Sequence, residues 1–461
     1  MHEISSYGRE RLEDFSTTIL KRQQLIRPQT LIREFTDIRN FLAANATGIT
    51  RDTAIVTEMA KILFCKAFDE INKGPEEIVD FQMSLHEAPE KVKFRLEGIF
   101  AKTKESKPEI FDPNDEIALD ANSICYVVRI LQKYEITRAD RDALGEAFET
   151  LIGPTLRGEE GQFFTPRNVI RLMIRMVNPK PSESLIDPAC GSGGFLVIAL
   201  DHMLRSIEKN EHCPTLSKAE EAKSELVSHI IGMDKDSFLA RLARVYVAIM
   251  SGDSAQVFCE NSLATHDSWS SVTKSKVALG SFDIVVTNPP FGSRIPVTGE
   301  ELLSQYSLGR LWKTRKEADK TDYVRTSRLK PFESPQILFI ERCLDFLREG
   351  GRMAIVLPEG VLGNTATGYV RRFIRNKAEV VAIVDCPLET FLPSTPTKVC
   401  ILVLQKLGKP QERSVFMAIA QKCGHDRRGV PLIGSKGALE DDFPIISDAF
   451  DEFRGRHHVS F

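Results

Sequence analysis

Apolar residues recur with two different periods along the chain, and the change of period divides it into regions. In the first third they recur at helical spacing, three or four residues apart on one face. Three such faces are Leu31, Phe35, Ile38 and Leu42; Ile55, Met59, Ile62 and Leu63; and Cys125, Val128 and Leu131. The polar stretch from Lys102 to Glu116 contains two prolines and is predicted as a loop. We therefore expect a helical N-terminal domain over residues 1–153.

Beyond this region, short apolar runs alternate with amphipathic stretches, which is the order typical of a parallel sheet with crossover helices. Strands are predicted at 184–187, 228–234, 257–259, 282–287, 352–357, 380–384 and 398–404, and helices at 167–177, 196–204 and 336–347. The pattern fades after about Gln405, where only a strand at 414–418 and a short helix near 445–453 are expected. The sequence therefore predicts an α/β domain over 154–425 and a short C-terminal tail over 426–461.

A glycine-rich turn follows the first predicted strand. The strand ends at Asp187, and the turn Pro188–Gly194 leads into a helix. Glycines in such a turn let a ligand approach the backbone at a helix N-terminus. An acid at the end of the strand suits a ligand with an ammonium group better than one with a pyrophosphate. The second strand also ends in an acid, Asp234, where folds of this kind bind ribose hydroxyls. Together these features favour S-adenosylmethionine over a nicotinamide cofactor.

The tetrapeptide Asn288-Pro289-Pro290-Phe291 ends the fourth predicted strand. The Asn288 side-chain carbonyl and the Pro289 backbone carbonyl can both accept hydrogen bonds from one NH2 group. The prolines fix φ and supply no competing donor, and Phe291 offers a flat apolar face. This is what methyl transfer to an exocyclic amine of a base requires, although Asn-Pro-Pro alone also fits a plain turn after a strand.

A third motif, Gly161-Gln162-Phe163-Phe164-Thr165-Pro166, precedes the first strand. Thr165 is predicted to cap the helix 167–177, with Pro166 at its first position. Capping explains these two residues but not the pair of aromatic residues directly before them.

With these motifs, the chain resembles the methylase (M) subunits of type I restriction-modification systems and the wider family of DNA adenine N6-methyltransferases. The resemblance covers about Phe148 to Gln405. It implies a Rossmann-like, seven-stranded S-adenosylmethionine-dependent methyltransferase domain behind a helical N-terminal domain. It also implies site-specific transfer of a methyl group from S-adenosylmethionine to a flipped adenine in DNA, as the modification subunit of a type I-like restriction-modification or defence system.

The resemblance also assigns residues. Those implied in catalysis are Asn288, Pro289, Pro290 and Phe291, and those implied in cofactor binding are Gln162, Phe163, Phe164, Thr165, Asp187, Ala189, Gly191, Ser192, Gly193, Asp234 and Asn261. Asn261 departs from the acid that the family often has, because Glu260-Asn261-Ser262-Leu263 is the best match to Gly-Asp-Ser-Leu. Gly252-Asp253-Ser254 comes too early for that match and is expected to end the preceding helix. The segment 391–397 resembles the family's loop near the flipped base.

The charge of the whole chain and the charge of one segment differ in how well they suit the expected partner, double-stranded DNA. The net charge is −3, so the chain as a whole has no basic footprint. Arg310–Lys330, however, contains eight basic and three acidic residues with Trp312 and Tyr323 interleaved. We weigh this segment equally as a DNA-backbone flap and as a plain solvated loop. The resemblance implies that a specificity subunit reads the target, and it leaves open an additional restriction subunit.

The remaining composition narrows the class of protein further. Nine scattered cysteines lack zinc spacing, so no metal site is expected, and they fit the reducing cytoplasm. No signal peptide or long apolar stretch is found, so no membrane association is expected. The rival functions are a protein glutamine methyltransferase, which also uses Asn-Pro-Pro, and a non-catalytic scaffold of a defence complex.

Overall fold

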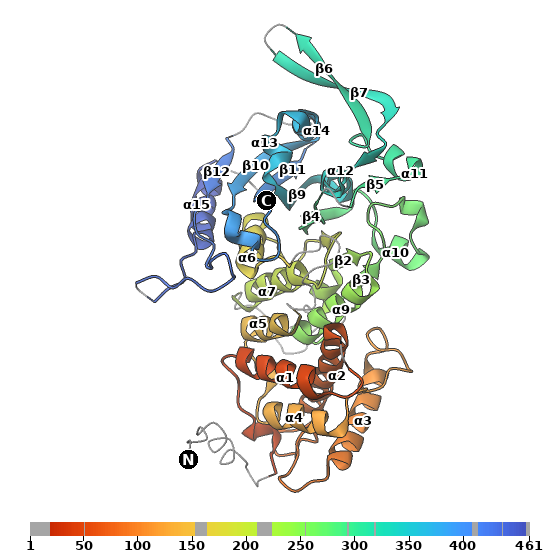
Figure 1. The fold of residues 1–461 in the computed structure, drawn as a ribbon, viewed down its shortest axis with the longest axis vertical. Coiled ribbons are helices and arrows are strands. Elements are labelled where there is room, and N and C mark those ends of the chain that lie inside the picture. The colour runs from red at the N-terminus through yellow and green to blue at the C-terminus, as the bar shows by residue number, and fades with distance from the viewer. Residues whose placement is uncertain are drawn as a thin grey trace, which may run out of the picture. The chain divides into compact units, whose positions relative to one another are not determined.

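The computed structural model describes residues 19–49, 51–152, 164–209, 224–253, 255–292, 295–317, 320–407, 414–435 and 437–457. The chain divides into two compact units, Met1–Thr155 and Leu156–Phe461 (Figure 1). The first unit is helical, and the second is built around a mixed sheet.

The first unit consists of helices, and the predicted apolar faces are buried except at Cys125, which is half-buried while Ile124 and Val127 lie inside. Within its described residues these are η2 (Arg22–Gln24), α1 (Ile32–Asn45), α2 (Asp52–Ile71), α3 (Pro89–Ser106), α4 (Ala121–Leu131), η3 (Ile136–Arg138) and α5 (Arg141–Ile152). Phe35, Ile38 and Leu42 of α1 are fully buried, which confirms the apolar face predicted there.

The loop predicted from residue 102 begins later than expected. Helix α3 continues to Ser106, and Lys107 ends it directly before Pro108. A residue that precedes proline is disfavoured in the helical conformation. The prediction was wrong for residues 102–106 because it followed polar composition, whereas Thr103 of this segment is buried by packing.

A mixed sheet of eight strands forms the centre of the second unit, in the order β12-β10-β11-β9-β4-β1-β2-β3. Its strands are β1 (Leu185–Asp187), β2 (Ile230–Asp234), β3 (Gln256–Cys259), β4 (Phe282–Thr287), β9 (Leu347–Pro358), β10 (Ala378–Asp385), β11 (Val399–Lys406) and β12 (Phe416–Ile419). Neighbours pair in parallel except β11, which is antiparallel to β9 and β10. Seven strands coincide with those predicted between residues 184 and 404 and confirm the Rossmann-like fold. The strand predicted at 414–418 is also present as β12, and its pairing beside β10 makes the sheet eight-stranded rather than seven-stranded.

Helices cover both faces of this sheet (Figure 1). They are α6 (Arg167–Val177), α7 (Gly194–Lys209), α9 (Ser237–Ser251), η4 (His266–Ser268), α10 (Ser271–Lys276), α11 (Glu300–Ser304), α12 (Pro335–Phe346), α13 (Glu359–Gly363), η5 (Thr365–Thr367), α14 (Gly368–Lys377), η6 (Leu388–Phe391) and α15 (Phe443–Arg456). Helices α6, α7 and α9 pack against one another, whereas α12 packs on β4 and β9 and α14 on β10. Alternate residues of β9 serve the two faces: Met353 joins the apolar cluster of α12, and Arg352 reaches the end of α6.

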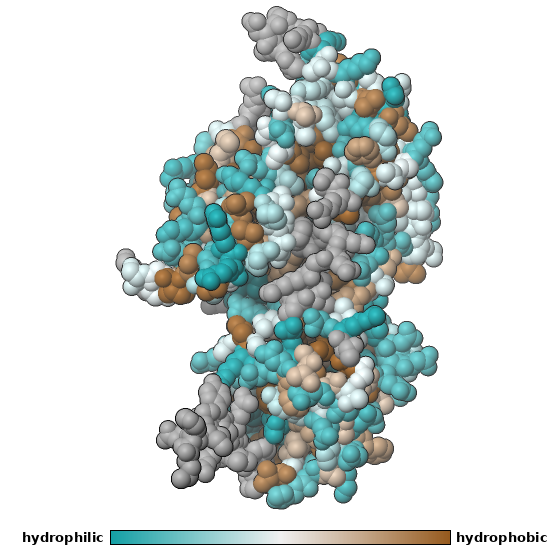
Figure 2. All heavy atoms as spheres, in the orientation of Figure 1, coloured by the Kyte–Doolittle hydropathy of each residue, from teal (hydrophilic) through white to brown (hydrophobic). Residues whose placement is uncertain are grey.

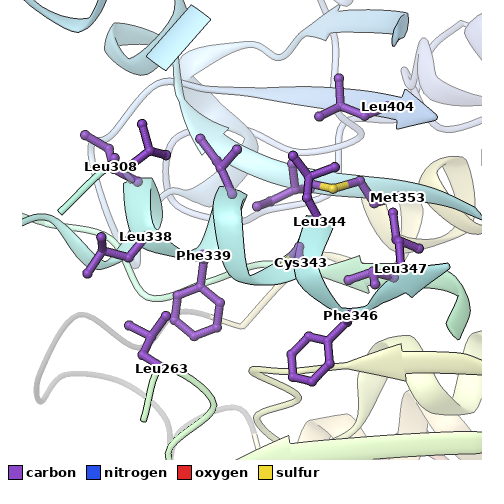
Figure 3. Packing of buried hydrophobic residues seen from close by; sticks show 14 of the residues in the cluster. Leu263, Leu308, Leu338, Phe339, Cys343, Leu344, Phe346, Leu347, Met353 and Leu404 are labelled. Atoms are coloured by element: carbon purple, nitrogen blue, oxygen red, sulfur yellow. The ribbon is translucent and has the colours of Figure 1, made fainter. Parts of the chain in front are cut away.

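A buried apolar cluster anchors α12 beside the sheet. In Figure 3, Leu344 of α12 points toward Met353 of β9, and Phe339 points toward Leu263, which follows β3. All four side chains are at most 5% exposed. Burying one such side chain contributes about 1.5–3 kcal/mol. The cluster therefore fixes the position of α12 relative to the loops at the carboxyl ends of the strands.

The described part of the predicted C-terminal tail is packed rather than extended. Helix α15 lies against α6 and carries Phe450, which is fully buried. The Phe450 ring meets Phe416 of β12 edge-on at 5.3 Å between centroids, and Arg175 of α6 pairs with Asp448 and Asp451. These contacts place α15 within the second unit, since the apolar side of a short amphipathic helix must be covered.

The basic segment 310–330, which we had weighed equally as a flap and as a plain solvated loop, is a regular ribbon. It consists of the antiparallel strands β6 (Arg310–Glu317) and β7 (Lys320–Leu329) and projects beyond α11 and α14 (Figure 1). Below it, β5 (Val297–Thr298) pairs with β8 (Phe332–Glu333). The plain loop is therefore the wrong alternative, because cross-strand pairs such as Trp312 with Arg325 hold the segment in register.

Candidate active site

The turn between β1 and α7 contains two glycines with different structural roles. Gly191 and Gly193 have φ values of 53° and 91°, in the left-handed region that favours glycine. A Cβ atom on Gly193 would lie 3.0 Å from the Cβ of Ala243 on α9, whereas one on Gly191 would meet nothing within 4 Å. Gly193 thus permits close packing of the turn on α9, and Gly191 borders open space.

Two buried carboxyl groups flank this turn. Asp187 accepts a hydrogen bond from Ala189 N through Oδ1 (3.1 Å), and its Oδ2 has no partner among the described residues. Asp234, at the end of β2, accepts from Gly191 N and Asp236 N, both at 2.9 Å. Burial raises the pKa of Asp187 to about 7 and also raises the pKa of Asp234, because desolvation disfavours the charged form. A cationic ligand would relieve this cost at both acids.

The side chain of Asn288 is oriented by a residue far away in the sequence. Its Nδ2 donates to the Oγ1 of Thr165 at 2.9 Å, directly before α6. The Oδ1 of Asn288 is buried, and nothing in the described part of the chain donates to it. An amide oxygen accepts hydrogen bonds, so the site retains one fixed, unused acceptor.

Thr165 therefore has a different role from the helix cap that we predicted. Helix α6 begins at Arg167 as expected, but Pro166 occupies the N-cap position and no side-chain hydrogen bond caps the helix. The extended backbone of Pro166 (φ −55°, ψ 139°) moves the cap position one residue past Thr165. The Thr165 hydroxyl is left free to accept from Asn288.

Phe291 lies at the base of the site, and its ring is only 3% exposed. The ring meets Phe391 edge-on, with 6.2 Å between the centroids and an interplanar angle of 82°. Phe391 begins the segment 391–397, which the family resemblance had placed near the target base. This contact brings the start of that segment next to the Asn288–Phe291 motif.

Asn261 follows β3 and lines the same space. Its Oδ1 accepts from Leu263 N at 3.1 Å, and its backbone oxygen accepts from the Nε1 of Trp269 at 3.0 Å. Gly252 has a φ of 76° and forms the C-cap of α9, which confirms that Gly252-Asp253 ends a helix. The position after β3 therefore belongs to Asn261.

These elements enclose one cavity of about 820 Å³ at the carboxyl ends of β1, β2, β3 and β4. The predicted site residues that line it are Phe164, Thr165, Ala189, Gly191, Ser192, Asp234, Asn261, Asn288, Pro289, Pro290 and Phe291. Asp187 and Gly193 lie behind its wall, and Gln162 and Phe163 fall outside the described residues. The cavity is large enough for a cofactor and a base together.

Several residues that line the cavity were missed from the sequence. Lys235 and Glu260 each directly follow a strand end, and this position could have indicated them. Glu260 accepts from Ser270 N (2.8 Å) and from the Oγ1 of Thr273 (3.1 Å), so it braces the next loop. The segment 295–298, Leu302 and Phe339 also line the cavity, but no sequence signal marks them because tertiary packing brings them there.

The described residues contain no group of three or more His, Cys, Asp or Glu side chains arranged to hold a metal ion. No helix within the described ranges has the length and apolar character needed to cross a membrane.

The fold and this cavity define a class I-type methyltransferase architecture, with a glycine turn after β1 and an Asn-Pro-Pro-Phe motif after β4. The chain belongs to the N-6 DNA methylase family, whose model matches residues 139–460. This match confirms the family that the sequence motifs had indicated.

Curated proteins similar to this chain include methylase subunits of type I restriction enzymes. The EcoEI methylase subunit of Escherichia coli is 29% identical over 279 residues, which cover 60% of this chain and 49% of that protein. The MjaIX methylase subunit of Methanocaldococcus jannaschii is 26% identical over 324 residues, which cover 68% of this chain and 49% of that protein. The chain thus spans about half the length of these relatives.

A solved structure shares the fold over most of both chains. The type I restriction-modification methyltransferase subunit from Streptococcus thermophilus superposes with a TM-score of 0.60 at 16% identity, covering 94% of this chain and 94% of that one. At this level of identity the likeness shows the architecture alone.

Proposed function

We propose that the chain transfers a methyl group from S-adenosylmethionine to the N6 amine of an adenine flipped out of double-stranded DNA. The observation that carries this proposal is the Oδ1 of Asn288. It is a buried acceptor without a partner among the described residues, it is fixed by Thr165, and it lies on a wall of the cavity that Gly191 borders. A buried unpaired acceptor costs about 1–3 kcal/mol, which a ligand N–H would recover.

The residues around the turn fit S-adenosylmethionine, which supplies an electrophilic methyl group when bound. The carboxyl group of Asp234 lines the cavity and suits ribose hydroxyls, and the carboxyl group of Asp187, directly behind the wall, favours a cationic ligand through its charge. Gly191 leaves space for the ligand at the backbone, and Phe164 and Asn261 line the same cavity. Gln162 and Phe163 are proposed to complete the site on the strength of their motif.

The Asn-Pro-Pro-Phe motif acts on the amine. Two acceptors, the Oδ1 of Asn288 and the carbonyl oxygen of Pro289, hold the two N6 hydrogens. This favours a tetrahedral nitrogen and returns its lone pair for attack on the methyl carbon. The new N–C bond forms as the S–C bond breaks, the electron pair stays on sulfur, and the amine then releases one proton. Catalysis is therefore mainly positioning and electrostatic complementarity.

A paired adenine cannot reach a buried acceptor, so the nucleotide must leave the stack. Phe291 and Pro290 present apolar surface inside the cavity for the extruded base. Stacking of a base on an aromatic ring is worth about 1–3 kcal/mol. We propose that the chain acts as the modification subunit of a type I-like system, with a specificity subunit that reads the target.

The test is to incubate the purified chain with radiolabelled S-adenosylmethionine and genomic DNA, with and without its co-expressed genomic neighbours. The DNA is then digested and the labelled base is identified. Labelled N6-methyladenine supports the proposal, and a requirement for a neighbour supports the subunit role. Absence of label in DNA under both conditions contradicts the proposal and returns attention to a protein substrate or a scaffold.

A further inference from the structure

A second, polar pocket lies at the base of the β6–β7 ribbon. Its volume is about 380 Å³, and it is lined by Ser304, Gln305, Tyr306, Ser307, Arg310, Arg325, Thr326 and Ser327. These residues come from the end of α11, the turn into β6, and β7. The lining includes two arginines and no carboxylate.

The two arginines of this pocket are held in place without being neutralised. Arg310 donates to the backbone oxygens of Ser327 (2.6 Å) and Ser304 (3.3 Å), and Arg325 donates to the Oγ of Ser307 (3.0 Å). Within the described residues neither guanidinium has a carboxylate partner. A guanidinium presents five N–H donors, so each retains donors for a ligand.

Two other basic groups, one at the end of the ribbon and one beside it, have acidic partners. Lys330 pairs with Glu333 and also bonds to the hydroxyl of Tyr369. Arg372 of α14 pairs with Asp322 of β7 at 2.9 Å. The two arginines of the pocket take part in neither of these ion pairs. Figure 2 shows hydrophilic side chains beside the tip of the ribbon.

The free polar groups of the pocket are mainly donors. The backbone oxygens of Ser304 and Ser327 already accept from Arg310, and Thr326 donates to the Leu311 backbone. The Ser307 hydroxyl accepts from Arg325, which leaves its proton free to donate. Guanidinium and serine donors together match an oxyanion, and arginine binds phosphate in this way.

The pocket is connected to the active-site cavity through one short helix. Leu302 of α11 lines the large cavity, and Ser304, two residues later, lines the polar pocket. A DNA strand whose base enters the cavity would therefore pass α11, whose end borders the pocket with Arg310 and Arg325. Phosphate contacts of this kind fix the register of a protein on DNA.

We propose that Arg310, Arg325, Ser307 and Ser327 bind a backbone phosphate of the DNA strand that carries the extruded adenine. This inference rests on the proposed function, because it takes the large cavity to be the adenine site. The proposal gives the ribbon one defined contact with a phosphate. This contact differs from the general attraction of DNA by the other basic residues of the ribbon.

The test compares Arg325→Gln with Arg328→Gln in the full chain. Both residues are exposed and both changes remove one positive charge from β7, but only Arg325 lines the pocket. Binding to a fluorescein-labelled duplex of mixed sequence is measured over a range of salt concentrations. The slope of log K against log salt is about −0.9 per phosphate contact. Arg325→Gln is expected to reduce its magnitude by about 0.9, and Arg328→Gln is expected to leave it unchanged.

Equal effects of the two variants, or no effect of Arg325→Gln, overturn the proposal. Ser327→Ala provides a second variant with no change in charge, and it is expected to weaken binding while leaving the salt slope unchanged. Cofactor binding and methyl transfer are measured on the same preparations. If neither wild type nor variant methylates DNA but Arg325→Gln still loses slope, the proposed function fails and the phosphate site stands.

Discussion

The buried polar groups at the two ends of β1, β4 and β9 differ in how far their hydrogen bonds are satisfied. At the carboxyl ends of β1 and β4, the Oδ2 of Asp187 and the Oδ1 of Asn288 lack hydrogen-bond partners in the described chain. At the other end, Arg352 is 2% exposed and all its nitrogens are used. It donates twice to Glu183 (2.8 and 2.7 Å) and also to the backbone oxygens of Val177 and Asn178.

A second network at that end is also saturated. Ser184 donates from both its N and its Oγ to Asp283 (2.8 Å each), and Arg348 donates to the other oxygen of Asp283. A buried polar group without a partner costs about 1–3 kcal/mol. The hydrogen bonds of these buried polar groups are therefore complete at one end of the strands. At the other end, where a ligand is expected, they are incomplete.

The first prediction concerns the free energy of unfolding, which we expect to depend strongly on the buried network around Arg352. Arg352→Ala leaves the Glu183 carboxylate and two backbone oxygens without their partner, and breaking such a buried pair costs about 3–5 kcal/mol. Urea or thermal unfolding of the second unit measures this loss. Arg348→Ala is the control, because Arg348 is 49% exposed and surface ion pairs contribute only about 0–1 kcal/mol. Equal losses in both variants would show that the two ends do not differ in this way.

The next effect is on catalysis. Asn288→Ala removes the unpaired acceptor, so transfer to adenine is expected to fall about 10²–10³-fold, as it does when one transition-state hydrogen bond is removed elsewhere. Unfolding stability and the dissociation constant for S-adenosylmethionine are expected to stay near wild type. Single-turnover methylation and isothermal titration check the two statements. Wild-type transfer by this variant contradicts the role of Asn288.

The raised pKa of Asp187 predicts that stability and cofactor binding both depend on pH. Burial raises its pKa in the folded protein to about 7, above the ordinary value of 3.8, so folding favours the protonated form. This contribution to stability is complete below pH 3.8 and is lost as the pH rises through about 7. A cationic cofactor favours the ionised form instead, so its affinity is expected to increase from about pH 5 to 7.

Titration of S-adenosylmethionine binding across this range tests the prediction against Asp187→Asn. The variant cannot ionise and is expected to bind more weakly, with a flatter pH dependence. Asp234 also has a raised pKa and lies on the same turn, so a residual slope is expected. If the pH profile of cofactor binding is unchanged in Asp187→Asn, the pH dependence comes from a group other than Asp187, which contradicts the prediction.

The smallest effect concerns the orientation of Asn288. Thr165→Val keeps the shape of the side chain but removes the oxygen that holds Asn288 Nδ2. One net hydrogen bond is worth about 0.5–1.5 kcal/mol, so transfer is expected to fall by up to about tenfold with cofactor affinity little changed. Thr165→Ser restores the hydroxyl and is expected to recover most of the rate. Loss of rate in both variants indicates a packing role for Thr165 instead.

Local patterns in the sequence determined much of the fold. The alternating apolar runs predicted seven strands of the sheet, and Arg167–Val177 was predicted as the helix that forms. The strand-turn-helix order placed Asp187, Asp234 and Asn288 at one edge, because the carboxyl ends of parallel strands meet there. These predictions succeeded because backbone periodicity and turn chemistry act over a few residues.

Tertiary structure alone decided the features that depend on distant parts of the chain. The bond from Asn288 to Thr165 joins residues 123 positions apart, and no local pattern distinguishes it from the helix cap that we predicted. The pairing of β6 with β7 and the contact of Phe450 with Phe416 likewise depend on partners that no local sequence pattern reveals. The sequence by itself determined which chemistry reaches the edge of the sheet. Packing decided which polar groups there are satisfied, since hydrogen-bond pairing is a property of atoms brought together in space.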